Sequence, residues 1–167
     1  MAAPPKKTAR KSPKSSVPFL LSQMGAHVSA TFGDRIAPLG LKPYHAGVLS
    51  VLGSKAGITQ QALAGLLGVF PSRLVGLLDD LARLNFIERR ASPGNRRSYA
   101  LHLTKAGHET WARVGEVAAE MQDDLCAALN DKEREVLADL LTRIVAQQQI
   151  TPGIHPAYRR MGGMCGE

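Results

Sequence analysis

The sequence is poor in cysteine and in aromatic residues. Its 167 residues include two cysteines, Cys126 and Cys165, and aromatic side chains make up only 5%. Two cysteines are too few for a disulfide framework, which favours a reducing, cytoplasmic compartment. With 44% hydrophobic residues and few aromatics, a core must be built mainly from Leu, Ala and Val, and such a composition favours helices.

Long apolar segments are also lacking. No run reaches the roughly 18 apolar residues of a membrane helix, and residues 1–16, with three prolines and five cations, do not fit a secretory leader. The sequence therefore predicts a cytoplasmic protein without membrane contact. The length fits one ordinary domain, which makes a multidomain enzyme an unfavourable interpretation.

Acidic residues are missing from the beginning of the chain, where the first is Asp34. Residues 1–16 carry five cations and no large apolar side chain, a composition that predicts a disordered basic arm. Such an arm either adds non-specific phosphate contacts or serves as a solubilising tail. Residues 55–105 have eight cations and three acids, whereas residues 106–150 have four cations and nine acids. This asymmetry indicates a surface that faces a polyanion, although charged, solvated helices would give a similar count.

Hydrophobic periodicity predicts a mainly α-helical chain. Apolar residues recur at steps of three and four over residues 17–37, 43–54, 59–67 and 71–84, and in two further helices after Thr104 and Asn130. Thr59, Thr104 and Asn130 are suitable N-caps. Asn85 is suited to end a helix because Asn tolerates the left-handed conformation. Residues 86–90 and 97–103 read as two short strands joined by a Ser-Pro-Gly-Asn turn.

The third and fourth predicted helices have the pattern of a helix-turn-helix motif. Small and apolar residues occupy the offsets at which the two helices must cross, among them Leu63, Ala64 and Leu67, and Gly68 supplies the sharp turn. A simple helical hairpin could meet several of these demands. The hairpin that follows, with Arg96 and Arg97 near its tip, favours the winged arrangement, in which the second helix enters the major groove and the wing reaches phosphates or the minor groove.

Residues 59–107 closely resemble the winged-helix core of the MarR family of bacterial transcriptional regulators. The resemblance rests on a Leu-Gly-Val-x-Pro-Ser turn, on Asp79 in the recognition helix, on Ile87-Glu88-Arg89-Arg90, on the Arg96-Arg97 wing tip and on a closing Leu-Thr-Lys-Ala-Gly. Residues 41–49 resemble the family's second helix, so that the match covers about residues 17–149. It implies a homodimer, formed by the first, fifth and sixth helices, that binds a roughly palindromic operator.

The resemblance also implies a division of the chain. We expect a disordered basic arm (1–16), an N-terminal dimerisation helix (17–40), a winged helix-turn-helix DNA-binding domain (41–104), C-terminal dimerisation helices (105–150) and an extended tail (151–167). The fold class is thus mainly α, with a small β-hairpin wing flanked by dimerisation helices.

Four positions depart from the family pattern. Val75 and Gly76 stand where a polar residue and Arg are frequent, and a cation appears earlier instead, at Arg73. Phe70 replaces the usual polar cap of the recognition helix, and Asn95 stands where the wing usually has Asp. The operator sequence can therefore differ from that of other members, and our prediction for base contact moves to Arg73.

We expect DNA contacts from the recognition helix, the wing and two flanking positions: Pro71, Ser72, Arg73, Gly76, Arg96, Arg97, Gln60 and Lys55. A guanidinium at Arg73 could grip guanine O6 and N7 or a phosphate, and Ser72 a phosphate oxygen. Gly76 would let the helix backbone approach the groove, although a glycine that merely weakens the helix is the plain alternative. We expect Arg96 to reach DNA and Arg97 to pair with Asp79 or Asp80.

The resemblance implies an effector as well, because many members lose DNA affinity when a small aromatic, an oxidant or a metal binds. His27, Tyr44, His45 and Trp111 are spread over the helices that line the family's effector cavity, although a tryptophan is more often a core residue. The five histidines show no metal-ligand spacing, and no catalytic constellation or cofactor motif is present.

The sequence thus predicts a sequence-specific, nucleoid-associated DNA-binding regulator, most simply a homodimeric repressor, with double-stranded DNA, a second copy of the chain and a small aromatic effector as partners. The alternative is an architectural, weakly specific DNA-binding protein that relies on the basic arm.

Overall fold

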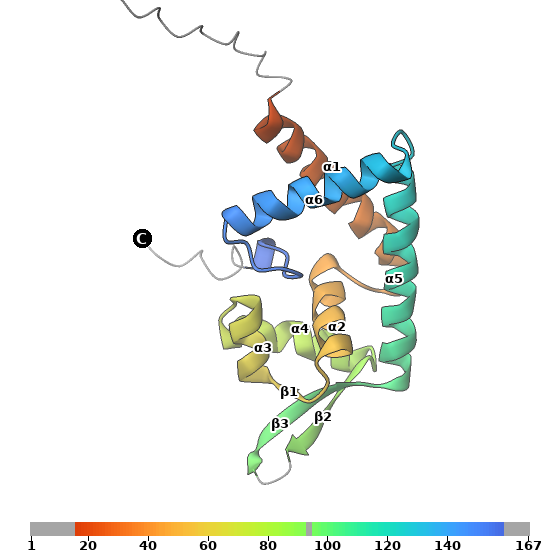
Figure 1. Cartoon of the computed structure of the whole chain (residues 1–167). Coiled ribbons are helices and arrows are strands. Elements are labelled where there is room, and N and C mark those ends of the chain that lie inside the picture. Colours follow the sequence, from red (N-terminus) through yellow and green to blue (C-terminus); the bar gives the residue numbers. More distant parts are fainter. Residues whose placement is uncertain (1–15, 93–94, 159–167) are drawn as a thin grey trace, which may run out of the picture.

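The computed structural model describes residues 16–92 and 95–158, which form a mainly helical fold with one small sheet (Figure 1). The elements, in chain order, are α1 (Val17–Ile36), the short 3-10 helix η2 (Ala37–Leu39), α2 (Pro43–Ser54), β1 (Ile58–Thr59), α3 (Gln60–Leu67), α4 (Pro71–Arg83), β2 (Ile87–Ser92), β3 (Asn95–Leu103), α5 (Lys105–Leu125) and α6 (Asp131–Gln147). This arrangement confirms the predicted fold class, a winged helix-turn-helix between N- and C-terminal helices.

The sheet contains one more strand than the sequence predicts. Its order is β1-β3-β2, and both pairings are antiparallel. β1 consists of two residues, with Ile58 opposite Leu101 and Thr59 opposite Ala100. Two residues cannot show a strand's alternating pattern, so this strand is recognised only from its pairing with β3. The hairpin of β2 and β3 is longer than predicted and projects from the molecule (Figure 1).

The hydrophobic core lies between α2, α3, α4 and the sheet. Its largest fully buried side chains are aliphatic: Ile36, Val48, Leu49, Leu52, Leu63, Leu67, Leu74, Leu78, Leu81 and Leu101. This composition agrees with the scarcity of aromatic residues in the sequence. The core fixes the helix-turn-helix against α2 and leaves its outer surface free.

Side chains cap three helices at the predicted residues. The Thr59 and Thr104 hydroxyls accept hydrogen bonds from the amides of Ala62 and Gly107, at 3.2 and 3.0 Å. Asn130 and Glu133 form a reciprocal capping box at the start of α6. Asn85 has a φ of 58° just after α4, which confirms that it serves as the left-handed residue beyond this helix.

The start of α5 sits directly against the backbone of Phe86, the residue before β2. A Cβ on Gly107 would overlap the Phe86 carbonyl oxygen. We expect Gly107→Ala to lower the free energy of unfolding by about 1–3 kcal/mol, the usual cost of overpacking, and urea denaturation measures this change. Gly115→Ala, on the same helix but with no atom within 4 Å of the added Cβ, should instead be neutral or stabilising by up to about 1 kcal/mol. Equal effects of both substitutions would contradict this close approach.

The described residues after α6, up to Tyr158, do not form the extended tail predicted from the sequence. Residues 151–158 turn back toward α2 (Figure 1) and end in a helical turn at Ala157 and Tyr158. Tyr158 is 2% exposed and belongs to the core cluster. The prolines and glycines of this segment produce turns rather than extended chain, and its one large aromatic side chain anchors it. Residues 159–167 lie outside the described part, as do residues 1–15 of the predicted basic arm.

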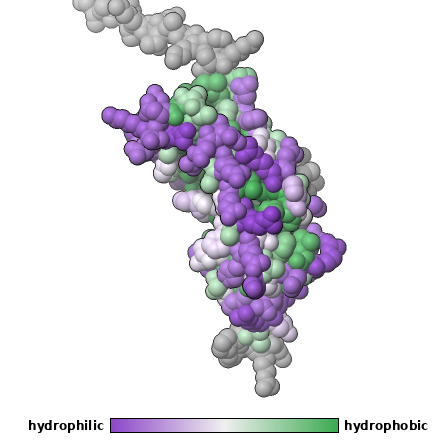
Figure 2. All heavy atoms as spheres, turned by 90° about the vertical axis from the view of Figure 1, so that its right-hand side faces the viewer, coloured by the Kyte–Doolittle hydropathy of each residue, from purple (hydrophilic) through white to green (hydrophobic). Residues whose placement is uncertain are grey.

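The helices at the end of the molecule opposite the hairpin carry uncovered apolar side chains. On α1 these are Val17, Phe19, Leu20, Leu21 and Met24, and on α6 they are Val136, Leu137, Leu140 and Ile144. Figure 2 shows hydrophobic surface beside the grey N-terminal residues, where α1 begins. α6 contains no buried residue, although its sequence has a regular apolar face. No other element of the described part of the chain buries this face.

Candidate DNA interface and effector cavity

α3 and α4 form the predicted helix-turn-helix. α3 ends at Leu67, Gly68 adopts the left-handed conformation with a φ of 68°, and Val69 is buried in the turn. Pro71 then occupies the first turn of α4, where its missing N–H is unpaired in any case. The chain bends by 111° between the two helices. This bend places α4 across α3 with one face on the core and the other free.

The exposed face of α4 brings together four of the residues predicted to contact DNA. Pro71, Ser72, Arg73 and Gly76 are all exposed, while Leu74, Leu78 and Leu81 on the opposite face are fully buried. A Cβ on Gly76 would have no atom within 4 Å, so the fold itself does not require a glycine there. Phe70, the N-cap residue, makes no side-chain cap hydrogen bond, as expected.

Two apolar residues on this surface were not among the predicted contacts. Phe70 is 58% exposed and Val75 is 40% exposed, and both flank the predicted contacts on α4. Their departure from the family pattern was the available signal, because an apolar residue at a recognition position is suited to contact a thymine methyl group. The surface of α4 therefore combines one cation in its first turn with apolar side chains.

An ion pair connects the wing to α4. Arg89 of β2 lies 2.7 Å from the Asp79 carboxylate of α4, and Asp80 pairs with Arg83 one turn along the same helix. From the sequence, Arg97 is expected to pair with one of these two aspartates. Asp79 and Asp80 thus have other partners in the structure, and the side chain of Arg97 lies outside the described part.

The remaining predicted DNA contacts lie at the end of α2, at the start of α3 and on the hairpin. Lys55 is exposed at the C-terminal end of α2, and the half-exposed Gln60 is the first residue of α3. Arg96 and Arg97 lie on β3 next to the tip of the hairpin, and the side chain of Arg96 is also outside the described part. The backbone therefore places these two residues in the part of the hairpin that projects from the molecule (Figure 1).

His45 lies between α2 and α4 rather than in a cavity. It is 2% exposed, and its Nδ1 accepts the Lys42 backbone amide at 3.3 Å. Its Nε2 lies 3.6 Å from an Asp80 carboxylate oxygen and has no hydrogen-bond partner among the described residues. Burial lowers the pKa of His45 below its ordinary value of 6.5, and the nearby Asp80 carboxylate only partly opposes this shift. The neutral imidazole is therefore the form that the fold holds.

This burial predicts a pH dependence of stability. Because the pKa of His45 is lower in the folded chain, the unfolded chain binds more protons below pH 6.5. The contribution of His45 to stability is therefore complete above that pH and is lost as the pH falls toward the folded-state pKa. Thermal unfolding between pH 7.5 and 5 should show a shallower loss of Tm in His45→Asn than in the parent. His108→Gln, an exposed change on α5, should leave the slope as it was; an unchanged slope in His45→Asn would contradict the assignment.

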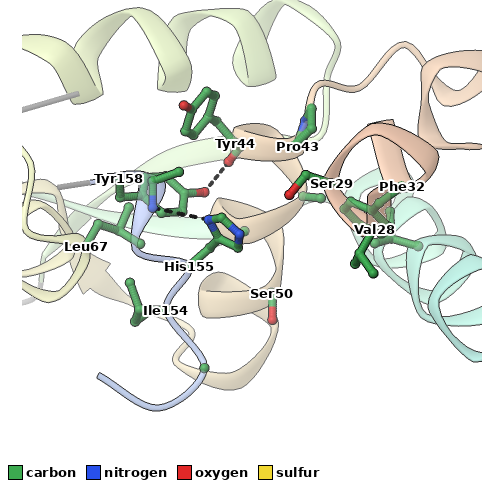
Figure 3. Close-up of a pocket in the computed structure, with 15 residues that line it drawn as sticks. Val28, Ser29, Phe32, Pro43, Tyr44, Ser50, Leu67, Ile154, His155 and Tyr158 are labelled. Atoms are coloured by element: carbon green, nitrogen blue, oxygen red, sulfur yellow. Dashed lines mark hydrogen bonds between the residues drawn. The ribbon is translucent and has the colours of Figure 1, made fainter. Parts of the chain in front are cut away.

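A cavity of about 450 Å³ lies between α1, α2 and the segment after α6 (Figure 3). It is lined by Val28, Ser29, Phe32, Pro43, Tyr44, Ala46, Gly47, Ser50, Leu67, Val114, Gly153, Ile154, His155, Ala157 and Tyr158. Of the four residues suggested for an effector cavity, only Tyr44 is in this lining.

The other three suggested cavity residues have different positions. His27 is exposed on α1, and His45 faces Asp80. The indole of Trp111 covers Gly53 of α2, where an added Cβ would lie 2.7 Å from the ring. Trp111 therefore acts as a packing residue. This is the core role that the sequence suggests as the alternative to a cavity residue.

The described residues contain no cluster of three or more His, Cys, Asp or Glu side chains arranged to hold a metal ion. In the same part of the chain no single helix is long and apolar enough to cross a membrane; only α3 and α4 taken together pass that test, as a pair bent by 111°.

Comparisons with known proteins agree with this geometry. A family model described as MarR family matches residues 39–98. The chain is 35% identical over 113 residues, 68% of each protein, to a protein of Thauera aromatica named as the transcriptional regulatory protein for the hcr operon, a naming that is itself provisional. It is 29% identical to the transcriptional repressor CouR, solved bound to a 23-mer DNA duplex, with a TM-score of 0.70 over 83% of this chain and 99% of that one.

The fold is also that of a MarR-family regulator from Rhodococcus sp. RHA1, with 24% identity and a TM-score of 0.67 over 80% of this chain and 95% of that one. These relatives regulate transcription and are not enzymes. Together with the helix-turn-helix and its wing, they show that the chain is a DNA-binding transcriptional regulator of the MarR family.

Proposed function

We propose that the chain acts as a homodimeric repressor that binds a pseudo-palindromic operator and is released from it by a small-molecule effector. The observation that carries this proposal is the pair of uncovered apolar faces on α1 and α6. They lie at the end of the molecule opposite the hairpin and α4 (Figure 1). A second copy that covers them would leave both DNA-reading surfaces free.

The apolar face of α6 has the geometry of a helix interface. Val136, Leu137, Leu140 and Ile144 follow one another at helical spacing along one side of the helix, and all four are exposed in the single chain. An uncovered apolar stripe of this kind marks a site of association. A two-fold contact would relate two copies of α4 symmetrically, and such symmetry matches a palindromic DNA site.

The exposed face of α4 supplies the specific part of DNA binding. Arg73 can contact a base edge, Ser72 a phosphate, and Gly76 leaves the helix backbone uncovered. CouR, 29% identical, is itself named a repressor and was solved on DNA, which favours repression as the function of this chain. The cavity beside α2 provides a place for the effector.

Fluorescence anisotropy tests the proposal. It measures binding of the full chain to its own upstream intergenic DNA and to a scrambled duplex, each across a salt series. We expect an affinity ratio of roughly 10³ or more at physiological salt, and sedimentation should show a dimer. The proposal would be contradicted if the chain bound the upstream DNA and the scrambled duplex with equal affinity and a steep salt slope, and if DNA selected from a random pool were bound no more tightly than either. That result would support the architectural alternative, and deleting residues 1–15 should then abolish most of the binding.

A further inference from the structure

The segment after α6 forms one side of the cavity. Val28, Ser29 and Phe32 line it from α1. The lining residues of α2 are Pro43, Tyr44, Ala46, Gly47 and Ser50. Ile154, His155 and Tyr158 line it from the opposite direction (Figure 3). The cavity therefore exists only because residues 151–158 turn back onto α2.

Several contacts hold this segment in place. The Tyr158 hydroxyl donates a hydrogen bond to the Tyr44 carbonyl oxygen at 2.5 Å, and the two rings meet edge to face with centroids 5.3 Å apart. Burial raises the pKa of Tyr158 above its ordinary value, so its hydroxyl keeps the proton that it donates. Gly47 leaves the space for this ring, because a Cβ there would overlap the Tyr158 hydroxyl. The segment is thus fixed by a buried aromatic anchor.

The chemistry of the lining limits what the cavity can bind. The described lining residues are mostly apolar and include no Lys, Arg, Asp or Glu. Their polar side-chain groups are the hydroxyls of Ser29, Ser50, Tyr44 and Tyr158 and the ring of His155. The Tyr158 hydroxyl already donates its hydrogen bond to the Tyr44 carbonyl oxygen. The His155 Nδ1 accepts the Ala157 amide, so that in the neutral ring Nε2 is left as a donor. A carboxylate placed here would lose its hydration without gaining a counter-charge from the described lining residues.

We propose that residues 151–158 are an integral wall of the effector cavity, and that this cavity selects uncharged, mostly apolar molecules over carboxylates and sulfonates. Leu67, the last residue of α3, also lines the cavity. A molecule held there contacts α1, the helix-turn-helix and the C-terminal segment at once. This inference rests on the proposed function, in which a ligand at this place changes DNA binding.

Two fluorescent probes with one skeleton test the selection by charge. N-phenylnaphthylamine is uncharged, and anilinonaphthalene sulfonate adds an anionic group to the same rings. Titration of the full chain without DNA should give saturable binding of the uncharged probe, one molecule per chain, with the sulfonate at least about tenfold weaker, which corresponds to about 1.4 kcal/mol. Equal or tighter binding of the sulfonate would overturn the proposed selectivity.

Variants locate the probe in the cavity. Ser50→Trp fills the lining from α2 and should abolish binding of the uncharged probe. Ser54→Trp, one turn along the same helix and outside the lining, should not. If both variants bind the probe as the parent does, the probe lies elsewhere, for example on the apolar faces of α1 and α6, and the cavity proposal is wrong.

A charge placed on the wall tests the role of the C-terminal segment. Ile154→Lys should weaken binding of the uncharged probe and strengthen binding of the sulfonate, so that the difference in affinity between the two probes shrinks or reverses. Pro156→Lys adds the same charge to an exposed residue of the same segment that does not line the cavity, and it should leave the ratio near that of the parent. Identical behaviour of these two variants would show that the segment is not a wall.

The assay contains no DNA, so it separates this inference from the proposed function. The expected probe pattern in a chain that shows no operator preference would support the cavity and refute effector-controlled repression. If the chain prefers a specific operator but binds no probe, or binds it in a way that Ser50→Trp does not affect, the DNA-binding part of the proposed function is supported and the cavity proposal is refuted.

Discussion

Replacing Arg73 by alanine is expected to weaken operator binding by about 10- to 100-fold and to relax the base preference at one position of each half-site. The guanidinium is exposed in the first turn of α4, off the buried Leu74 and Leu78 face. From there it can make two hydrogen bonds to guanine, and a bidentate contact of this kind contributes about 1–3 kcal/mol of discrimination. Anisotropy on the operator and on single-base variants measures both effects.

Three further substitutions give this experiment its controls. Arg73→Lys keeps the charge but not the forked geometry, so it should keep non-specific affinity and still lose the base preference. Arg96→Ala should lower affinity about equally for all sequences and reduce the salt slope, as expected for a phosphate contact. Arg143→Ala, on α6 at the other end of the molecule, should change neither. An Arg73→Ala protein with unaltered affinity and preference would contradict the proposed docking of α4.

The other large effect is expected from a substitution that prevents a second copy of the chain from binding to α6. Leu140→Glu places a carboxylate in the centre of the uncovered apolar face of α6, where burial against another copy would leave the charge unpaired at a cost of several kcal/mol. We expect a monomer in sedimentation experiments. Because a monomer engages one half-site, the affinity for the full operator should fall by more than about 100-fold.

The matched control lies on the same helix. Thr142 is exposed and faces away from the apolar side, with its hydroxyl bonded to the Ala138 carbonyl. Thr142→Glu should leave the dimer and its operator affinity unchanged. Because α6 has no buried residue in the single chain, neither substitution should unfold the protein, and circular dichroism can verify this. A dimeric Leu140→Glu protein would contradict an interface on this face.

The sequence predicts the helices of this fold well because each of them carries its own local signals. Thr59, Thr104 and Asn130 cap helices through hydrogen bonds to residues three positions away, and the buried face of α4 repeats at helical spacing. The wing is predicted for a similar reason, since turn residues separate two short β-rich segments. The exposed positions of α4 then follow from the same helical period.

The features that the sequence does not predict depend on contacts between residues that are distant in the sequence. Tyr158 and the Tyr44 carbonyl are 114 positions apart, and the glycine that makes room for the ring, Gly47, looks in the sequence like any other helix glycine. β1 exists only through its pairing with β3. The cavity lining combines α1, α2, α3, α5 and the C-terminal segment, so no single segment reveals it.

The two faces of α4 have a consequence for how such regulators diversify. The side chains that hold the helix in the fold, Leu74, Leu78 and Leu81, are fully buried, whereas Ser72, Arg73, Val75 and Gly76 are exposed. Substitutions at exposed positions away from such packing contacts usually change stability by no more than about 0.5 kcal/mol. After a gene duplication, a copy could therefore acquire a new target site through changes at these four positions, without passing through unfolded intermediates.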